Sequence, residues 1–158
     1  MKKDISMKKA GPSDLETVSY IVKTTISTVY PHYYPAGAVE FFLKHHSAEN
    51  ISGDIEENRV FLCFDAEQNA VGTVKVKENE ICRLFVLPQR QEQGYGNGML
   101  SYAENMIFGG YSEIRLDASW PAKKIYQQRG YQEAEFHIIE TENGDFLCYD
   151  VMIRRRED

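Results

Sequence analysis

Cysteine is scarce in this chain, and its spacing fits neither a disulfide framework nor a metal site. Only three cysteines occur among 158 residues: Cys63, Cys82 and Cys148. Their odd number and the lack of any C-x-x-C pair argue against structural disulfides and against zinc binding, so we expect no metal. Each cysteine lies in an apolar, strand-like stretch. We therefore expect buried, reduced thiols, which are typical of a cytoplasmic protein.

Long apolar runs and excess positive charge are also missing. No run approaches the ~18 apolar residues of a membrane-spanning helix, and segment 1–16 is charged, without the apolar stretch of a signal peptide. We therefore expect no membrane partner. The chain has 18 basic and 24 acidic residues, a formal net charge of −6. Nucleic-acid phosphates require a clearly cationic surface, so this balance argues against a nucleic-acid partner. It favours, weakly, a small cationic amine.

The hydrophobic pattern predicts one α/β domain over residues 1–158. A short strand in 5–11 is followed by a helix, for which Ser13 is expected to be the N-cap and Glu16 to complete a capping box. Two prolines interrupt this helix within 30–38. A helical stretch to residue 58, with a second start near Ser47, is expected next, followed by three strands over 59–87 and a long helix. A strand at 112–119 and a short helix at 121–130 follow. The chain is expected to end in a hairpin with a two-residue turn at Asn143-Gly144.

A glycine-rich loop, QEQGYGNGML at residues 91–100, lies between a nearly all-apolar strand and a helix. This arrangement predicts an anion site, because glycines let phosphate approach backbone N–H groups at a helix N-terminus. A P-loop would require Gly-Lys-Ser/Thr, which is absent. A dinucleotide fingerprint would require glycine where Met99 stands, and Gly98 is out of phase. The remaining pattern is Q/R-x-x-G-x-G/A, which Gln91, Gly94 and Gly96 fit.

The stretch RLFVLPQRQEQGYGNGMLSYAENMI resembles the central acetyl-CoA motif of the GCN5-related N-acetyltransferases, and the resemblance extends over about residues 4–153. It implies that family's mixed, mostly antiparallel sheet flanked by helices, in the order β-α-α-β-β-β-α-β-α-β-β. It also implies that the backbone of Leu84, Phe85 and Val86 pairs with the pantetheine amides. The backbone amides expected to hold the pyrophosphate are those of Glu92, Gln93, Gly94, Tyr95, Gly96 and Asn97.

A second stretch, DASWPAKKIYQQRGYQE, resembles the family's N-x-x-A-x-x-x-Y-x-x-x-G-F motif. Ser119 stands at the asparagine position, where its hydroxyl can bind a pantetheine amide with fewer hydrogen bonds. Lys123, beside the motif, is a candidate for phosphate contact. The resemblance gives Tyr126 the role of general acid toward the leaving CoA thiolate. The alternative is a core tyrosine whose ring packs the helix on the sheet.

A base is also expected, because an ammonium group has no lone pair with which to attack. The candidate is Glu80, which lies before the glycine loop. At the same distance before that loop, the histone-acetylating branch of the family has a glutamate that acts as base through water. Alternation along the strand is expected to place Glu80, Cys82 and Leu84 on one face. The alternative for Glu80 is a solvated turn glutamate. Cys82 is also the residue that could carry an acyl-enzyme, although direct transfer requires none.

The acceptor site is expected at the proline-rich aromatic segment, from Tyr30, His32 and Tyr33, which could form a wall or a cation–π face for an amine. The alternative is a packed lid, and His32 is an alternative base. His45 and His46 occupy adjacent helical positions, so they are expected to point apart, to bind no metal and to be solvated or half-packed.

The sequence thus predicts an acetyl-CoA-dependent N-acetyltransferase that acts by direct transfer on a primary amine of a small molecule. Two alternatives stay open. One is a non-catalytic acyl-CoA-binding or sensing module on the same fold, and the other is a nucleotide-binding protein that uses the glycine loop. A homodimer is compatible with the fold, but no residue pattern indicates one.

Overall fold

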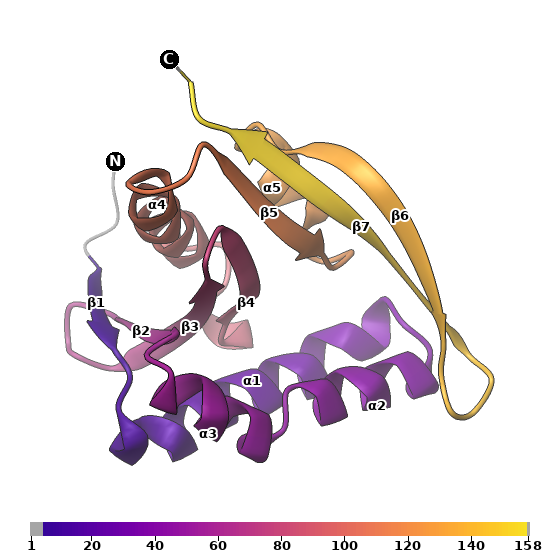
Figure 1. Ribbon diagram of the computed structural model, residues 1–158. Coiled ribbons are helices and arrows are strands. Elements are labelled where there is room, and N and C mark those ends of the chain that lie inside the picture. The colour runs from indigo at the N-terminus through magenta and orange to yellow at the C-terminus, as the bar shows by residue number, and fades with distance from the viewer. Residues whose placement is uncertain (1–4, 158) are drawn as a thin grey trace.

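A computed structural model describes residues 5–157 and shows one seven-stranded sheet with helices on both faces (Figure 1). The helices are α1 (Leu15–Val29), α2 (Ala36–His45), α3 (Ala48–Glu56), α4 (Tyr95–Phe108) and α5 (Lys123–Gln128). The strands are β1 (Ser6–Lys9), β2 (Val60–Phe64), β3 (Ala70–Lys77), β4 (Glu80–Val86), β5 (Glu113–Ala118), β6 (Gln132–Glu140) and β7 (Phe146–Arg155). Short 3-10 turns lie at Pro12–Asp14, Tyr30–His32 and Pro88–Arg90.

The sheet has the strand order β1-β2-β3-β4-β5-β7-β6, and every neighbouring pair is antiparallel except β4 and β5. The mixed, mostly antiparallel sheet and the order of elements predicted from the sequence are therefore confirmed. The second helical stretch is divided into α2 and α3 at Ser47, whose hydroxyl accepts a hydrogen bond from the Asn50 amide. That is the second start that the sequence indicates.

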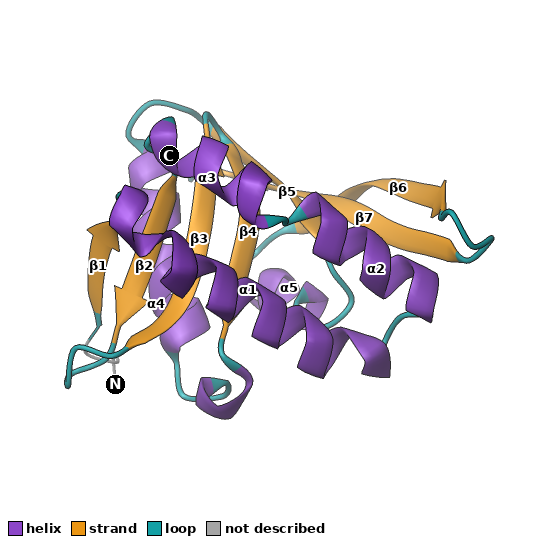
Figure 2. Cartoon of the chain, turned by 90° about the horizontal axis from the view of Figure 1, so that it is seen from below, coloured by secondary structure: helices purple, strands orange, loops and turns teal. Residues whose placement is uncertain are grey.

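The helices cover the two faces of the sheet unequally. Helices α1, α2 and α3 lie on one face, and α4 and α5 lie on the other (Figures 1 and 2). On the α1 face, Ile21 and Ile26 pack in one cluster with Leu62 of β2, and on the α4 face Leu100 packs in another with Leu116 of β5. Burial of these apolar faces is the main stabilising contribution to such a layered fold.

Two local sequence predictions were wrong. The Ser13 cap does not form, because the chain makes a 3-10 turn there and the Asp14 carboxylate instead accepts a hydrogen bond from the Gly11 amide. The terminal hairpin forms, but its turn is longer than two residues. Gly144 alone has positive φ there, whereas a two-residue Asn-Gly turn of the favoured type needs it at both positions.

The parallel pair β4–β5 is short, and this creates the main opening of the fold. Only Glu80 and Ile81 at the start of β4 pair with β5, opposite Arg115 and Leu116. Beyond them the two strands diverge, while β4 stays paired with β3 as far as Val86. The later half of β4 therefore has an unpaired edge inside the sheet.

Candidate active site

The unpaired edge of β4 exposes backbone groups to the gap. In an antiparallel ladder, successive residues turn their N–H and C=O groups to opposite sides. The amide of Leu87 bonds to Val71 of β3, so the amides of Leu84 and Val86 face away from β3, toward the gap. Phe85 turns its backbone to β3 and places its side chain in the cavity described below. An extended ligand with amide groups can add to this edge as a strand does.

The glycine loop follows β4 and leads directly into α4. Gly94 is the N-cap and has φ of 94°, a left-handed conformation that glycine adopts without strain. The first bond of the helix runs from the Gly98 amide to the Gly94 carbonyl. The earlier amides of Gly96 and Asn97 thus have no acceptor within the helix. A Cβ on Gly96 would meet nothing nearer than 3.9 Å, so the space there is open to a ligand.

Other loop residues hold the loop in place. The Gln91 side chain donates a 3.0 Å hydrogen bond to the Val86 carbonyl, which ties the loop to the end of β4. Arg90 pairs with the buried Asp65 carboxylate, and its guanidinium lies over the ring of Tyr95, 5.6 Å from the centroid. A Cβ on Gly98 would lie 2.6 Å from Ile5, so glycine at that position permits close packing of α4 against the chain before β1.

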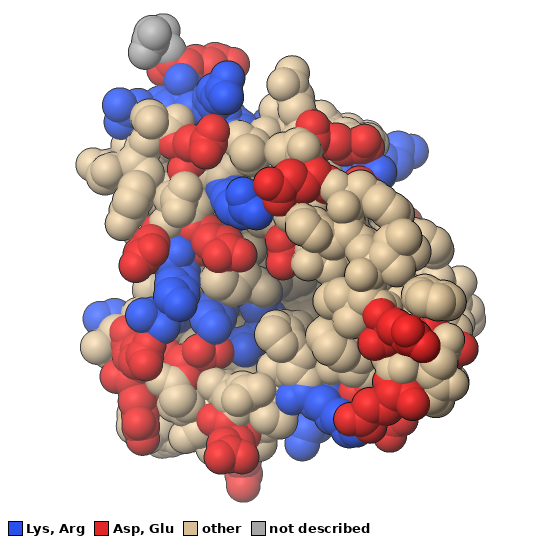
Figure 3. Space-filling model, turned by 45° about the vertical axis from the view of Figure 1, so that its right-hand side comes forward, with Lys and Arg blue, Asp and Glu red and all other residues tan. Residues whose placement is uncertain are grey.

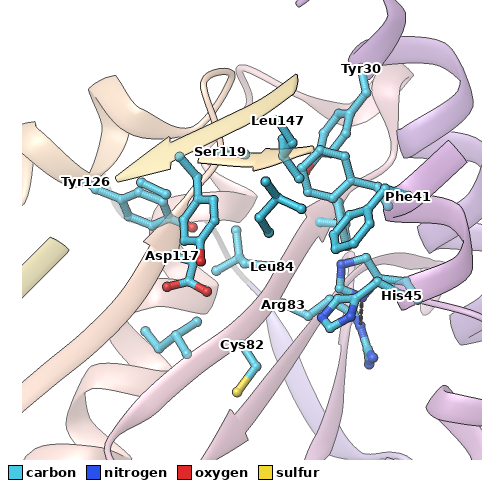
Figure 4. Close-up of a pocket in the computed structure, with 17 residues that line it drawn as sticks. Tyr30, Phe41, His45, Cys82, Arg83, Leu84, Asp117, Ser119, Tyr126 and Leu147 are labelled. Carbon is cyan, nitrogen blue, oxygen red and sulfur yellow. Dashed lines mark hydrogen bonds between the residues drawn. The ribbon is translucent and has the colours of Figure 1, made fainter. Parts of the chain in front are cut away.

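A cavity of about 190 Å³ opens where β4 and β5 diverge. Figure 3 shows the surface hollowed there, with acidic and basic side chains both at its border. The lining combines aromatic, aliphatic and ionisable side chains from α2, β4, β5, α5 and the β6–β7 hairpin (Figure 4). The lining residues are Tyr30, Phe41, Phe42, His45, His46, Ile81, Cys82, Arg83, Leu84, Phe85, Asp117, Ala118, Ser119, Tyr126, Ile139, Leu147 and Tyr149.

Tyr126 lies at the cavity wall formed by α5, and its ring points toward Asp117 and Ser119 in Figure 4. The residue is 5% exposed, and its hydroxyl makes no hydrogen bond to any part of the described chain. Burial raises the pKa of this phenol well above its usual value of 10. The group therefore stays protonated at physiological pH and can donate a proton or a hydrogen bond.

A β-bulge in β4 changes which residues share a face. Lys75 pairs with Arg83 and Val76 with Ile81, so Cys82 is an extra residue without a partner in β3. Glu80, opposite Lys77, therefore lies on the face of Arg83, and the expectation that it shares a face with Leu84 was wrong. A regular alternation across the strand could not reveal this insertion.

Glu80 is not among the residues that line the cavity, whereas Asp117 is. Burial, and then the negative charge of Asp117, raise the pKa of the Glu80 carboxyl above its usual value. Burial likewise raises the pKa of Asp117, against the attraction of Arg115. Burial raises the pKa of the Cys82 thiol to about 11, which makes it a poor nucleophile.

The acceptor-site residues are only partly those expected. Tyr30 lines the cavity and is buried, whereas the 3-10 turn at Tyr30–His32 directs His32 and Tyr33 to the surface, away from the lining. Tyr34 is buried instead. Its hydroxyl accepts a 2.7 Å hydrogen bond from the Trp120 amide, and the two rings stack at 5.3 Å. These contacts connect the aromatic segment to the loop after β5.

Ser119 and Lys123 have different surroundings. Ser119 lines the cavity at the end of β5, across from β4, as a contact to a bound ligand requires. The Lys123 ammonium is held by two carboxylates, at 2.8 Å from Asp150 and 2.7 Å from Glu133. Since both partners compete with a phosphate, we do not retain Lys123 as a phosphate ligand.

Sequence reasoning missed His46 and Arg83, which belong to the cavity wall. Helix α2 ends at His45, so His46 departs from the helix and turns inward, and the rings of His45 and His46 lie 4.8 Å apart. The one available indication was Arg83 itself, a charge within an apolar strand that needs a buried partner.

Within residues 5–157 no group of three His, Cys, Asp or Glu side chains could hold a metal ion, and no helix there could cross a membrane.

Comparison with solved structures identifies the class of fold. A GCN5-related N-acetyltransferase from Rhodopseudomonas palustris matches with a TM-score of 0.88 at 17% identity, over 99% of this chain and 98% of that one. PaiA N-acetyltransferase from Thermoplasma acidophilum, solved with coenzyme A, matches at 0.72 and 21% identity, over 97% and 99%. The ribosomal-protein-S18-alanine N-acetyltransferase from Escherichia coli matches at 0.70 and 16% identity, over 96% and 94%.

The family follows from the sequence match. The family model of the acetyltransferase (GNAT) domain matches residues 29–143, which is most of the chain. No curated protein matches. The chain belongs to the GNAT acetyltransferase family.

Proposed function

We propose that the protein is an acetyl-CoA-dependent N-acetyltransferase that acts on a primary amine of a small molecule. The observation that carries the proposal is the unpaired edge of β4, which continues into a glycine loop and opens beside a cavity containing a protonated tyrosine. The β4 edge suits the amide-containing pantetheine arm, the glycine loop suits the pyrophosphate at one end of that arm, and the cavity suits the reacting thioester at its other end.

Leu84 and Val86 would hold the pantetheine arm through their backbone amides, and the amides at the start of α4 would hold the pyrophosphate. Ser119 would contact the pantetheine from across the gap. When bound, acetyl-CoA supplies an acetyl group already activated as a thioester. A backbone amide that faces the gap would polarise the thioester carbonyl.

We assign to Tyr126 the role of general acid, because its buried hydroxyl faces the cavity and stays protonated. A thiol has an ordinary pKa of about 8.5, so its thiolate leaves readily and the proton donor adds to an already favourable step. Glu80 would remove the proton from the amine through water, since it does not line the cavity itself.

The supporting experiment is an amine panel with detection of free CoA thiol and of the acetylated product. Amine-dependent thiol release supports the proposal. Saturable acetyl-CoA binding without turnover of any amine would favour an acyl-CoA sensor. Binding of ATP or NAD in place of acetyl-CoA would favour a nucleotide-binding protein.

A further inference from the structure

The cavity has two chemically different walls. Figure 4 shows Asp117 on one side and Arg83 and His45 on the other. The Asp117 carboxylate forms no hydrogen bond or ion pair with any residue of the range 5–157. It lies on the same side as Tyr126, where the amine has to react. An ammonium group arriving at the cavity would find its counter-charge there.

The opposite wall presents a fixed hydrogen-bond donor. Arg83 Nε donates a 3.1 Å hydrogen bond to His46 Nδ1, so the ring proton of a neutral His46 is on Nε2. Burial, and then the charge of Arg83, lower the pKa of His46 to about 2, which keeps the ring neutral. His46 is 7% exposed and lines the cavity, and its Nε2–H has no acceptor in the described chain.

Positive charge lies directly behind this donor. The Asp54 carboxylate is shared by Arg83 Nη2 at 2.9 Å and by Lys75 Nζ at 2.8 Å. These three side chains together carry one net positive charge, and the Glu80 carboxylate lies within electrostatic reach of Lys75. The side chain of Arg83 is 2% exposed, and its Nη1 is buried with no hydrogen-bond partner among the described residues. This wall therefore favours an oxygen that carries negative charge.

We propose that the acceptor is an amino-carboxylate, with its carboxylate at the His46 wall and its amine at Asp117. The inference rests on the proposed function, because it specifies the acceptor of that same cavity. Phe41, Phe42, Ile139 and Leu147 line the space and suit an apolar side chain. A simple alkylamine would leave the His46 donor without an acceptor in a desolvated site, which weakens its binding.

The first test uses the wild-type protein and matched acceptors that differ only in the carboxylate. One set is leucine, leucinamide and 3-methylbutylamine, and another is phenylalanine, phenylalaninamide and 2-phenylethylamine. We expect kcat/KM to be at least about tenfold higher for the amino acid than for the amine, the effect of a hydrogen bond to a charged group. Equal or better turnover of the amines in both sets would overturn the proposal. Preference for the amides would instead indicate a peptide N-terminus.

The second test asks whether His46 causes the preference. In His46→Phe the ratio of kcat/KM between amino acid and amine should fall toward one, and His46→Gln, which keeps a donor, should restore part of it. Glu113→Gln, an exposed carboxylate paired with Arg155, is the control. An unchanged ratio in His46→Phe would overturn the assignment.

Failure of the acceptor assignment can be distinguished from failure of the proposed function. If acetyl-CoA binds but no amine is acetylated, the proposed function fails. The acceptor assignment is then judged by titrating leucine and 3-methylbutylamine into the protein saturated with acetyl-CoA. Saturable binding of leucine alone supports it, and binding of neither compound or of both equally contradicts it.

Discussion

Replacing Tyr126 by phenylalanine separates the chemistry of the hydroxyl from the packing of the ring. The ring fills the interior beside Tyr131, with centroids 5.6 Å apart, and phenylalanine keeps that packing. Because the Tyr126 hydroxyl has no hydrogen-bond partner in the described chain, no internal hydrogen bond is lost. We therefore expect the free energy of unfolding of Tyr126→Phe to equal or slightly exceed that of the wild type.

The expected loss is in catalysis. General acid catalysis contributes roughly 10²–10⁴-fold, and a thiolate leaving group needs the acid less than an alkoxide would. We expect the lower end, a fall in kcat of about 10²-fold, which corresponds to about 2.7 kcal/mol in the barrier. The KM for acetyl-CoA should change little, since the lost interaction serves the leaving group. Initial rates of thiol release over a range of acetyl-CoA concentrations measure both constants.

Tyr131→Phe is the matched control. The Tyr131 hydroxyl donates a 2.9 Å hydrogen bond to the buried carboxylate of Glu104, and neither residue lines the cavity. Its removal should lower the free energy of unfolding by about 1–3 kcal/mol and leave kcat near the wild-type value. A general-acid role for Tyr126 is refuted if Tyr126→Phe retains wild-type kcat, or if the two variants lose activity equally.

Further predictions concern the base, the loop, the interior and pH. If Glu80 is the base, the acidic limb of the pH profile of kcat/KM lies above pH 4.5, because the pKa of Glu80 is raised. In Glu80→Gln this limb should disappear together with most of the activity. An unaltered pH profile would exclude Glu80 as the base. Gly94→Ala forces an L-residue to φ of 94°, which should lower the free energy of unfolding by about 1–2 kcal/mol and weaken acetyl-CoA binding in calorimetry. Gly110→Ala, at a position without positive φ, should change neither quantity. Glu104→Gln removes the charge that pairs with Arg129 and Arg154 and should destabilise the fold by about 3–5 kcal/mol in urea titrations, so a loss below 1 kcal/mol contradicts the buried network. Because the pKa of His46 is lowered to about 2, the unfolded chain binds the additional proton below pH 6.5, and stability should fall by at most about 1.4 kcal/mol per pH unit on acidification; His46→Phe should flatten that slope relative to the wild type.

The parts of the fold that depend on local patterns could be predicted from the sequence. The alternation of Val60, Leu62 and Phe64 and the apolar run before Leu87 gave the central strands, because side-chain periodicity reflects burial directly. The glycine loop is also visible in the local sequence, because the positive φ at residue 94 favours glycine there. These features place the proposed cofactor contacts.

The acceptor wall could not be predicted in the same way, because tertiary pairing creates it. The bulge at Cys82 depends on the register of β3 with β4, and it moves Glu80 to the face of Arg83. His46 enters the wall only because α2 ends one residue earlier and because Arg83 approaches from a distant strand. An arginine inside an apolar strand indicates a buried partner but does not identify it.

The central claim is that this chain transfers acetyl groups from acetyl-CoA to amines. Mass spectrometry of a reaction with acetyl-CoA and the panel of amines and amino acids tests it most directly, with wild type and Tyr126→Phe compared at equal concentration. We predict that the wild type forms an acetylated amine and free CoA in equal amounts, and that the variant forms both far more slowly. Acetyl-CoA that is bound but never consumed, with no acetylated product from any acceptor, would contradict it.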